Sequence, residues 1–215
     1  ERKAQIDGIF ITHAHEDHVG AIGHYWEQLG APVYARPFTA NIARRKLDEH
    51  GHPESVVKVV QPYPEMIACG PMTVSYLPIS HSIPESAGLL IDTPEGRVLH
   101  SGDFKIDETP VVGDPWNETL WEEVSKDGVK ALVCDSTNVF NPEPSGSEGA
   151  VHRAMMEEIA AHKGKRVLVT TFASNVARLQ TLGEVARETG RQICVAGRSL
   201  DRIIEVAQDN GYLAD

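Results

Sequence analysis

Apolar and polar positions alternate along the first 135 residues in a way that predicts strands and helices in succession. Residues 6–11 form a short run rich in β-branched side chains, which predicts a buried strand. Apolar residues at helical spacing predict helices over 18–29 and 39–50, each stopped by a following glycine. Further strands are predicted at residues 32–35, 56–61, 72–77, 88–92, 97–101 and 130–134, with a helix at 118–126 before the last of them. Pro94-Glu95-Gly96 supplies the turn between the strands at 88–92 and 97–101.

The rhythm changes after residues 140–147, a segment rich in Pro, Ser and Gly that predicts a linker. Ser147 and the residues around it favour the start of a helix that runs to about residue 162. Strands at 166–172 and 192–196 then alternate with helices at 175–188 and 200–210. This order is typical of a parallel α/β unit. We therefore expect two domains, residues 1–145 and 146–215.

A dense group of metal-ligand side chains follows the first predicted strand. Three histidines, His13, His15 and His18, and the carboxylate of Asp17 lie within six positions. His13 and His15 are two residues apart and point the same way if the backbone stays extended. Asp17 and His18 can then address a second point nearby. Neutral imidazole and carboxylate suit zinc or manganese, whereas the plain alternative is a polar turn that contains histidines by chance.

Three more candidates stand at the ends of later predicted strands. His81 could supply a third nitrogen to one metal ion, and Asp103 is a carboxylate able to bridge two ions. Asp135 also ends a strand, although the Asp-Ser-Thr-Asn sequence there could simply satisfy loop amides. His50 and His52 resemble a ligand pair, but no strand precedes them, and we leave them out of the site.

The second predicted domain offers a candidate phosphate site. Ligands of parallel α/β sheets bind beyond the carboxyl ends of the strands, and helix N-termini there favour phosphate. Simple N-capping by Ser or Asn is the competing interpretation. The candidate substrate-binding residues are Phe172, Ala173, Ser174, Asn175 and Arg198.

Composition narrows the classes of function. The chain has 215 residues and a formal net charge of −11, and residues 146–215 carry nine acidic and nine basic side chains. Such an acidic protein is not a general binder of nucleic-acid backbone, so a polyanionic substrate would have to be held by metal and a few placed groups. Its apolar runs are shorter than the ~18–20 residues of a membrane span.

Cysteine usage and the chain ends bear on the cellular setting. Cys69, Cys134 and Cys194 are widely spaced, which argues against a disulfide framework and for a reducing compartment. We expect all three to be small buried residues and the location to be cytoplasmic. The opening at Glu1 shows no signal peptide, and the abrupt start and end suggest a segment of a longer chain.

The candidate ligands, taken in order, resemble a known family. The His-x-His-x-Asp-His sequence at 13–18, followed by His81 and Asp103, resembles the metallo-β-lactamase superfamily. Asp135-Ser136-Thr137 resembles the first motif of its β-CASP branch, whose members act on nucleic acids. The resemblance becomes specific to the bacterial ribonuclease J family through residues 12–20, 80–86, 101–105, 171–175 and 197–199.

This resemblance implies a fold and a ligand set. The fold is an αββα sandwich, here without its N-terminal strands, followed by the first part of a parallel α/β β-CASP domain. Two divalent metal ions are implied, with zinc first and manganese as the alternative. The family pattern assigns His13, His15 and His81 to one ion, Asp17 and His18 to the other, and Asp103 to both.

The resemblance also implies an activity. Family members cut RNA as endonucleases and as 5′-to-3′ exonucleases that prefer a 5′ monophosphate, in RNA processing and decay. Asp17 could take the proton of the attacking water, and Asp135 would orient a ligand histidine or a proton-transfer partner. We expect RNA as partner, no membrane association, and a homo-oligomer in the full-length protein. The family's later histidine motifs lie outside residues 1–215, so these residues by themselves should bind metal weakly.

Three alternatives stay open on sequence. The first is a sandwich hydrolase that acts on a small ester, thioester or β-lactam, although such an enzyme needs no α/β segment after residue 146. The second is a non-catalytic RNA-binding homologue, which the complete set of six ligands argues against. The third is a nuclease that acts on DNA, which composition does not separate from a ribonuclease.

Overall fold

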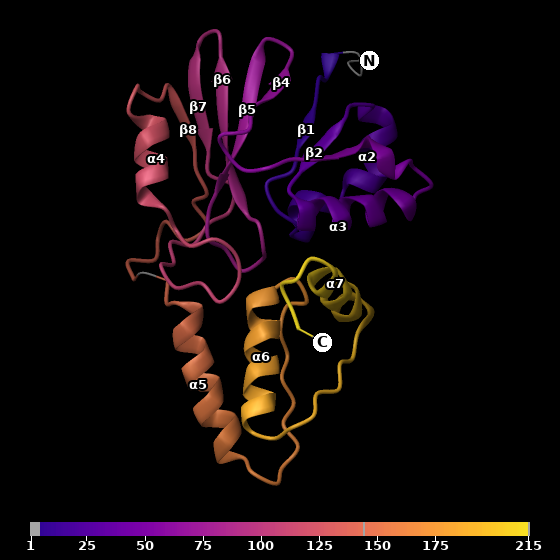
Figure 1. The fold of residues 1–215 in the computed structure, drawn as a ribbon, viewed down its shortest axis with the longest axis vertical. Coiled ribbons are helices and arrows are strands. Elements are labelled where there is room, and N and C mark those ends of the chain that lie inside the picture. Colours follow the sequence, from indigo (N-terminus) through magenta and orange to yellow (C-terminus); the bar gives the residue numbers. More distant parts are fainter. Residues whose placement is uncertain (1–4, 144, 215) are drawn as a thin grey trace.

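The computed structural model describes residues 5–143 and 145–214, which form two lobes stacked along the long axis (Figure 1). The upper lobe holds two β-sheets with helices on their outer sides. The lower lobe is built from three helices, α5 (Glu148–Ala161), α6 (Val176–Glu188) and α7 (Arg198–Asp209). The predicted linker at 140–147 joins the two lobes, and its Pro144 lies outside the described residues.

The first sheet is parallel and follows the order β1-β2-β3. The predicted helix at 18–29 is two helices, since the chain bends at Gly20 and Ala21. The elements are β1 (Ile9–Phe10), α1 (Glu16–Val19), α2 (Ile22–Leu29), β2 (Val33–Ala35), α3 (Pro37–Asp48), a 3-10 turn (Glu54–Val56) and β3 (Val57–Val59).

The second sheet has the order β4-β5-β6-β7-β8, antiparallel throughout except for the parallel β7–β8 pair. The hairpin predicted at Pro94-Glu95-Gly96 joins β6 and β7. The three-residue strand β4 is present in addition to the strands predicted from the sequence. The elements are β4 (Ile67–Cys69), β5 (Met72–Pro78), β6 (Ala87–Thr93), β7 (Gly96–His100), α4 (Glu118–Ser125) and β8 (Ala131–Val133).

The two sheets face each other across an apolar layer. Tyr76 of β5 is fully buried in it, and its hydroxyl donates to the Tyr34 carbonyl of β2 at 2.7 Å. The Phe10 ring stacks on Tyr34 with centroids 4.9 Å apart. Helices α2 and α3 cover the outer side of the first sheet, and α4 covers the second through Val124 and its neighbours. This arrangement confirms the predicted αββα sandwich.

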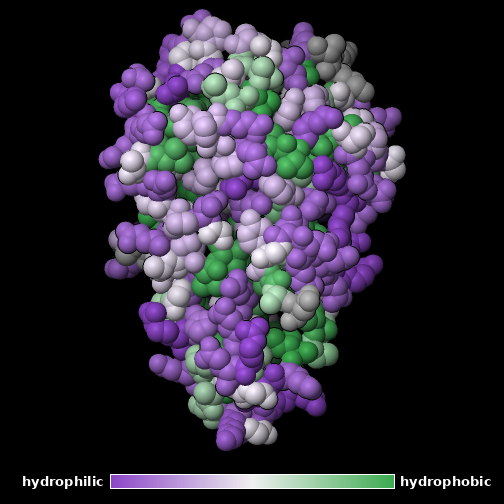
Figure 2. All heavy atoms as spheres, viewed as in Figure 1, coloured by the Kyte–Doolittle hydropathy of each residue, from purple (hydrophilic) through white to green (hydrophobic). Residues whose placement is uncertain are grey.

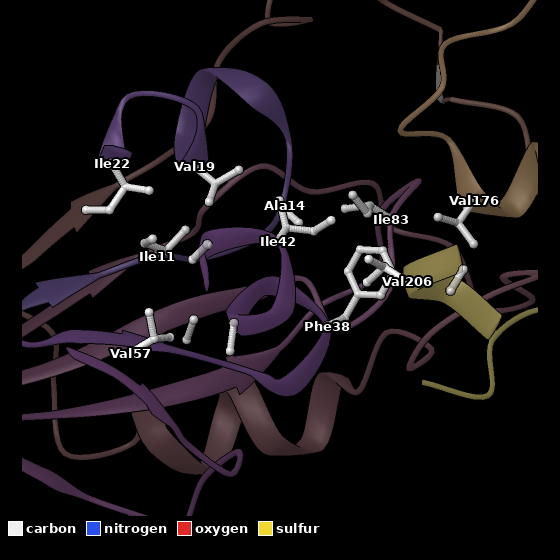
Figure 3. Close-up of a cluster of buried hydrophobic side chains, with 14 of the residues drawn as sticks. Ile11, Ala14, Val19, Ile22, Phe38, Ile42, Val57, Ile83, Val176 and Val206 are labelled. Atoms are coloured by element: carbon white, nitrogen blue, oxygen red, sulfur yellow. The ribbon is translucent and has the colours of Figure 1, made fainter. Parts of the chain in front are cut away.

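The lower lobe packs onto the upper one through a shared apolar cluster. Val176 of α6 and Val206 of α7 are buried beside Phe38 of α3 and Ile83 of the loop after β5 (Figure 3). An exposed ion pair, Arg45 Nη1 to Glu205 Oε2 at 2.8 Å, joins α3 and α7. The lobes therefore contact one another close to the segment that carries His81.

Buried Glu85 adds a polar connection at this junction. Its backbone has the left-handed φ of 58°, and its carboxylate accepts the Phe38 amide at the start of α3 at 2.7 Å. The Tyr212 hydroxyl of the lower lobe donates to the same carboxylate at 2.9 Å. Burial first, and then the neighbouring Glu85, raise the pKa of Tyr212 far above its ordinary value.

The predicted strands at 166–172 and 192–196 are not part of a sheet within the described residues. Both segments lack regular secondary structure, and Leu168 and Ile193 are 89% and 56% exposed. A strand is stabilised by hydrogen bonds to a neighbouring strand and by cover on its faces, and the described part of the lower lobe offers neither. The helices of the predicted α/β unit are therefore present, whereas its strand pairing is not.

Exposure corrects one further expectation, that all three cysteines are buried. Cys69 is buried, but Cys134 and Cys194 are exposed, and these three thiols are free in the described chain. The strand β8 is exposed at each of its residues. Polar residues cover most of the face shown in Figure 2, with apolar patches on both lobes. Each helix in the described residues is too short or too polar to cross a membrane.

Candidate metal centre

The His13–His18 segment is shaped by the passage from β1 into α1. Residue His15 has extended backbone angles, φ −68° and ψ 150°, and caps the helix that begins at Glu16. Its carbonyl accepts the amide of His18 at 3.0 Å. His13 and His15 therefore lie on extended backbone, whereas Asp17 and His18 lie on the first turn of a helix. Because of this change in backbone geometry, side chains of one short segment can reach two neighbouring candidate metal positions.

Three imidazoles and one carboxylate surround the first candidate metal position. His13 Nε2 and His81 Nε2 each lie 3.1 Å from His15 Nδ1, and His13 Nε2 lies 3.8 Å from Asp103 Oδ2. One ligand atom from each of these four residues lies within 4.8 Å of all the others. The side chains come from three separate loops, after β1, β5 and β7, and converge as the ligands of a tetrahedral zinc site would.

The second candidate metal position lies beside the first, and the two share a carboxylate. His18 Nε2 is 3.2 Å from Asp103 Oδ2 and 3.6 Å from Asp17 Oδ2. Ligand atoms of Asp17, His18 and Asp103 also lie within 4.8 Å of one another. Asp103 thus belongs to both groups, as a bridging carboxylate would. The structure brings all six predicted ligands together.

The position of Asp103 depends on the close approach of the preceding residue, Gly102, to the backbone of Ala87. Gly102 has φ +61°, and a Cβ atom there would lie 2.6 Å from the Ala87 carbonyl oxygen. Its amide donates to His100 Nδ1 at 3.0 Å. Glycine is therefore required by both conformation and space at the position before Asp103.

Burial sets the protonation of the imidazoles. His13 is fully buried, and desolvation, reinforced by the neighbouring histidines His18 and His15, lowers its pKa to about 2. Desolvation and then His15 lower the pKa of His81 to about 4. Both rings are therefore neutral at pH 7, which is the form that binds metal. The donor set and its protonation fit divalent ions such as zinc.

Two hydroxyl groups near the ligands escaped sequence analysis. Thr12 Oγ1 lies 3.0 Å from His13 Nδ1, and Ser82 Oγ lies 3.4 Å from His15 Nε2. The Thr12 contact leaves His13 Nε2 facing the cluster, so it orients the ring. The only sequence signal for these two residues is that each is adjacent to a candidate ligand. This signal is weak because serine and threonine are common in turns.

Asp135 lies close to the cluster without belonging to either ligand group. Its Oδ1 accepts from the Thr137 amide at 2.9 Å and from the Thr137 hydroxyl at 2.7 Å. Burial would raise the pKa of Asp135, but hydrogen bonds from Thr137 and the Phe104 amide, and the nearby His81, lower it overall. Both interpretations from sequence therefore find support: a turn cap, and an anion placed beside a candidate ligand.

The candidate substrate residues lie at helix starts of the lower lobe. Asn175 caps α6, accepting the Arg178 amide at 2.9 Å, and Phe172 is 84% exposed. Val176, directly after the loop, packs in the same cluster as Ile83, two residues beyond His81 (Figure 3). Arg198 is exposed at the start of α7. The loop at 172–175 thus ends next to a residue that packs at the junction near the His81 segment, and its Asn175 also caps α6.

The histidines excluded on sequence lie elsewhere on the surface. His24 of α2 and exposed His50 pair with each other, ring nitrogens 3.1 Å apart. The ring of His52 contacts Trp26, with centroids 5.3 Å apart. These three residues join neither of the ligand groups found in the described part of the chain.

Comparison with known proteins agrees with this geometry. Residues 1–173 match the family model of the beta-lactamase superfamily domain, and residues 164–215 match that of the ribonuclease J beta-CASP domain. A protein of unknown function from Enterococcus faecalis shares the fold, with a TM-score of 0.65 at 15% identity over 95% of this chain and 49% of that one.

Curated relatives align along nearly the whole chain. Ribonuclease J of Sinorhizobium meliloti is 39% identical over 99% of this chain and 38% of its own length. Ribonuclease J 1 of Streptococcus pyogenes is 38% identical over 97% of this chain and 37% of its own. Ribonuclease J2 of Bacillus subtilis is 32% identical over 99% and 38% respectively. The chain thus spans well under half the length of these relatives.

The sandwich, the two convergent ligand groups and the family matches agree on one assignment. The family model covers most of the chain, and the remainder matches the β-CASP model. The chain belongs to the metallo-β-lactamase superfamily, in its β-CASP branch, and is similar to ribonuclease J.

Proposed function

We propose that the protein containing this chain is a metal-dependent ribonuclease that hydrolyses RNA phosphodiester bonds. The observation that carries the proposal is the pair of ligand groups that share Asp103 beside the start of a ribonuclease J-like β-CASP domain. Relatives named ribonuclease J support RNA as the substrate class. A cytoplasmic site of action, a homo-oligomer and both exonuclease and endonuclease activity belong to the same proposal.

The residues take distinct roles in this proposal. His13, His15 and His81 would hold one divalent ion, Asp17 and His18 the other, and Asp103 both. Bound ions, zinc or manganese, supply Lewis-acid chemistry that acidifies water and offsets charge on phosphoryl oxygens. Neutral His13, which is buried, and neutral His81, which is partly buried, offer their ring nitrogens without first losing a proton.

Proton transfer and substrate binding complete the proposal. Asp17 has a side chain that is 78% exposed, so a water molecule can reach it and give up a proton there. Asp135 would act through the nearby imidazole of His81. The loop at 172–175 and Arg198 would hold RNA phosphates, including a preferred 5′ monophosphate, at the N-termini of α6 and α7.

Substitution of Asp103 tests the function directly. In the complete protein that contains this chain, Asp103→Ala should remove bound metal and reduce RNA hydrolysis by about a hundredfold or more, because both ligand groups lose their shared oxygen. Elemental analysis and cleavage of a labelled RNA measure the two effects. Asp201→Ala, at an exposed acid of α7, serves as the control and should change neither.

A substrate panel separates the proposal from its rivals. The wild-type protein should cleave RNA, but not DNA of the same sequence, nitrocefin or S-lactoylglutathione. Hydrolysis of one of the last two without RNA cleavage would assign the chain to a small-molecule hydrolase. Unchanged metal content in Asp103→Ala would remove Asp103 from the site.

A further inference from the structure

Glu148 lies at the junction of the two lobes with its charge largely withdrawn from solvent. It is the first residue of α5, and its side chain is only 10% exposed. Its Oε1 accepts from Lys105 Nζ at 3.3 Å, and its Oε2 accepts from Arg178 Nη2 at 3.3 Å. One carboxylate therefore holds a cation from each lobe.

Lys105 connects Glu148 to the two loops that carry His81 and Asp103. Lys105 follows Asp103 by two residues, and its amide donates to the carbonyl of Ser80 at 2.9 Å. Ser80 directly precedes His81. Buried Asp107 provides a second link between Glu148 and Ser80. Its carboxylate accepts the Glu148 amide at 3.1 Å, and its own amide donates to Ser80 Oγ at 3.1 Å. The start of α5 is thus bound to the Asp103 loop at two places.

Arg178 connects Glu148 to the candidate substrate loop. It lies in the first turn of α6, and its amide donates to the capping oxygen of Asn175 at 2.9 Å. Its buried Nε has no hydrogen-bond partner within the described residues, so the contact with Glu148 is the one that directs its guanidinium. A continuous polar path therefore runs from the Asp103 loop to the loop at 172–175.

A buried carboxylate between two cations specifies geometry more than it adds stability. Removing it leaves Lys105 and Arg178 facing each other with partly desolvated charges, which is costly. A carboxylate that merely joined the lobes would not need to contact these loops. Arg45 and Glu205 join the lobes through an exposed pair on α3 and α7, remote in sequence from both loops.

We propose that Glu148 is a positioning residue that sets the Asp103 loop and the 172–175 loop at a fixed separation. RNA held by the lower lobe would then be correctly placed at the metal centre for cleavage. This inference rests on the proposed function, because it requires RNA to be bound at one loop and cleaved at the other. Glu148 itself contacts neither metal nor substrate.

Two substrates of different size test this role in the complete metal-loaded protein. Glu148→Gln keeps the shape and removes the charge. It should lower kcat/KM for RNA by about ten- to a hundredfold, because small misplacements of a bound substrate cost that much. Hydrolysis of bis(p-nitrophenyl) phosphate, which needs the metal centre but not the 172–175 loop, should change less than twofold, and metal content should not change. Glu205→Gln is the matched control and should leave both rates unchanged.

Other outcomes overturn the inference. An RNA rate within twofold of wild type shows that Glu148 positions nothing, and equal losses on both substrates, or lost metal, show general damage to the centre. If Glu148→Gln fails to fold, Arg178→Met replaces it with the same expected selectivity, and Arg178→Lys should recover most of the RNA rate. A wild-type protein that cleaves the small diester but no RNA contradicts the proposed function itself, and the positioning role with it.

Discussion

At the scale of single residues, burial keeps the imidazoles of the cluster in the form that binds metal. His13 is shielded from solvent and touches His15, His18 and Asp103 within a few ångströms. Protonating it would place a charge in a site that is both desolvated and crowded with other imidazoles. The same arrangement makes the metal-free protein sensitive to acid.

The stability of the metal-free protein should fall as the pH is lowered from 7 to about 4. The unfolded chain binds protons on His13 and His81 near pH 6.5, whereas the folded pKa values are about 2 and about 4. Within this window the unfolded state holds more protons, so acid favours unfolding. Urea titrations at several pH values, after metal removal by chelation, measure the free energy of unfolding.

His81→Gln should make this decline shallower, since one of the buried imidazoles responsible is gone. His162→Gln serves as the control, because that side chain is 44% exposed. Parallel curves for wild type and His81→Gln between pH 7 and 4.5 would contradict the assigned cause.

At the scale of elements, close packing of α2 against α3 supports the helix layer beside the cluster. A Cβ atom at Gly23 would lie 2.4 Å from both the Lys46 carbonyl oxygen and His50 Nδ1. Gly23→Ala should therefore destabilise the protein by about 1–3 kcal/mol, because the helices must move apart. Chemical denaturation measures the change.

Gly183 of α6 provides a matched control for the same substitution. It is also a helix glycine, but a Cβ atom there would meet nothing within 4 Å. Gly183→Ala should stabilise by roughly 0.5–1 kcal/mol through backbone entropy. Similar effects of both substitutions would mean that helix propensity, not packing, governs this region.

Elements were predictable where one stretch of sequence decides them. The hairpin at Pro94-Glu95-Gly96 and the helix cap at Ser147 depend on local backbone preferences, and both form as expected. The strands expected at 166–172 and 192–196 depend on partners from elsewhere in the chain. Both segments have the apolar pattern of a strand, but that pattern does not provide the neighbouring strand with which they would have to pair.

At the scale of the whole molecule, the lower lobe is anchored to the sandwich but leaves apolar side chains exposed. Residues 1–215 by themselves should bind divalent metal more weakly, and cleave RNA at least about tenfold more slowly, than a protein of the relatives' length, because the family's later histidine motifs are not among them. Calorimetric metal titration and RNA cleavage at equal concentration measure both. Full activity of residues 1–215 would refute this expectation.

The sequence by itself determined which residues could form the site. The order of ligands along the chain, the strand before each of them and the helix starts of the lower lobe are local features. The tertiary structure decided that His13, His15 and His81 meet within 4.8 Å, that Asp103 joins both groups, and that Glu148 links two loops. Such meetings depend on how distant strands and helices pack, because side chains far apart in sequence approach one another only through a shared core.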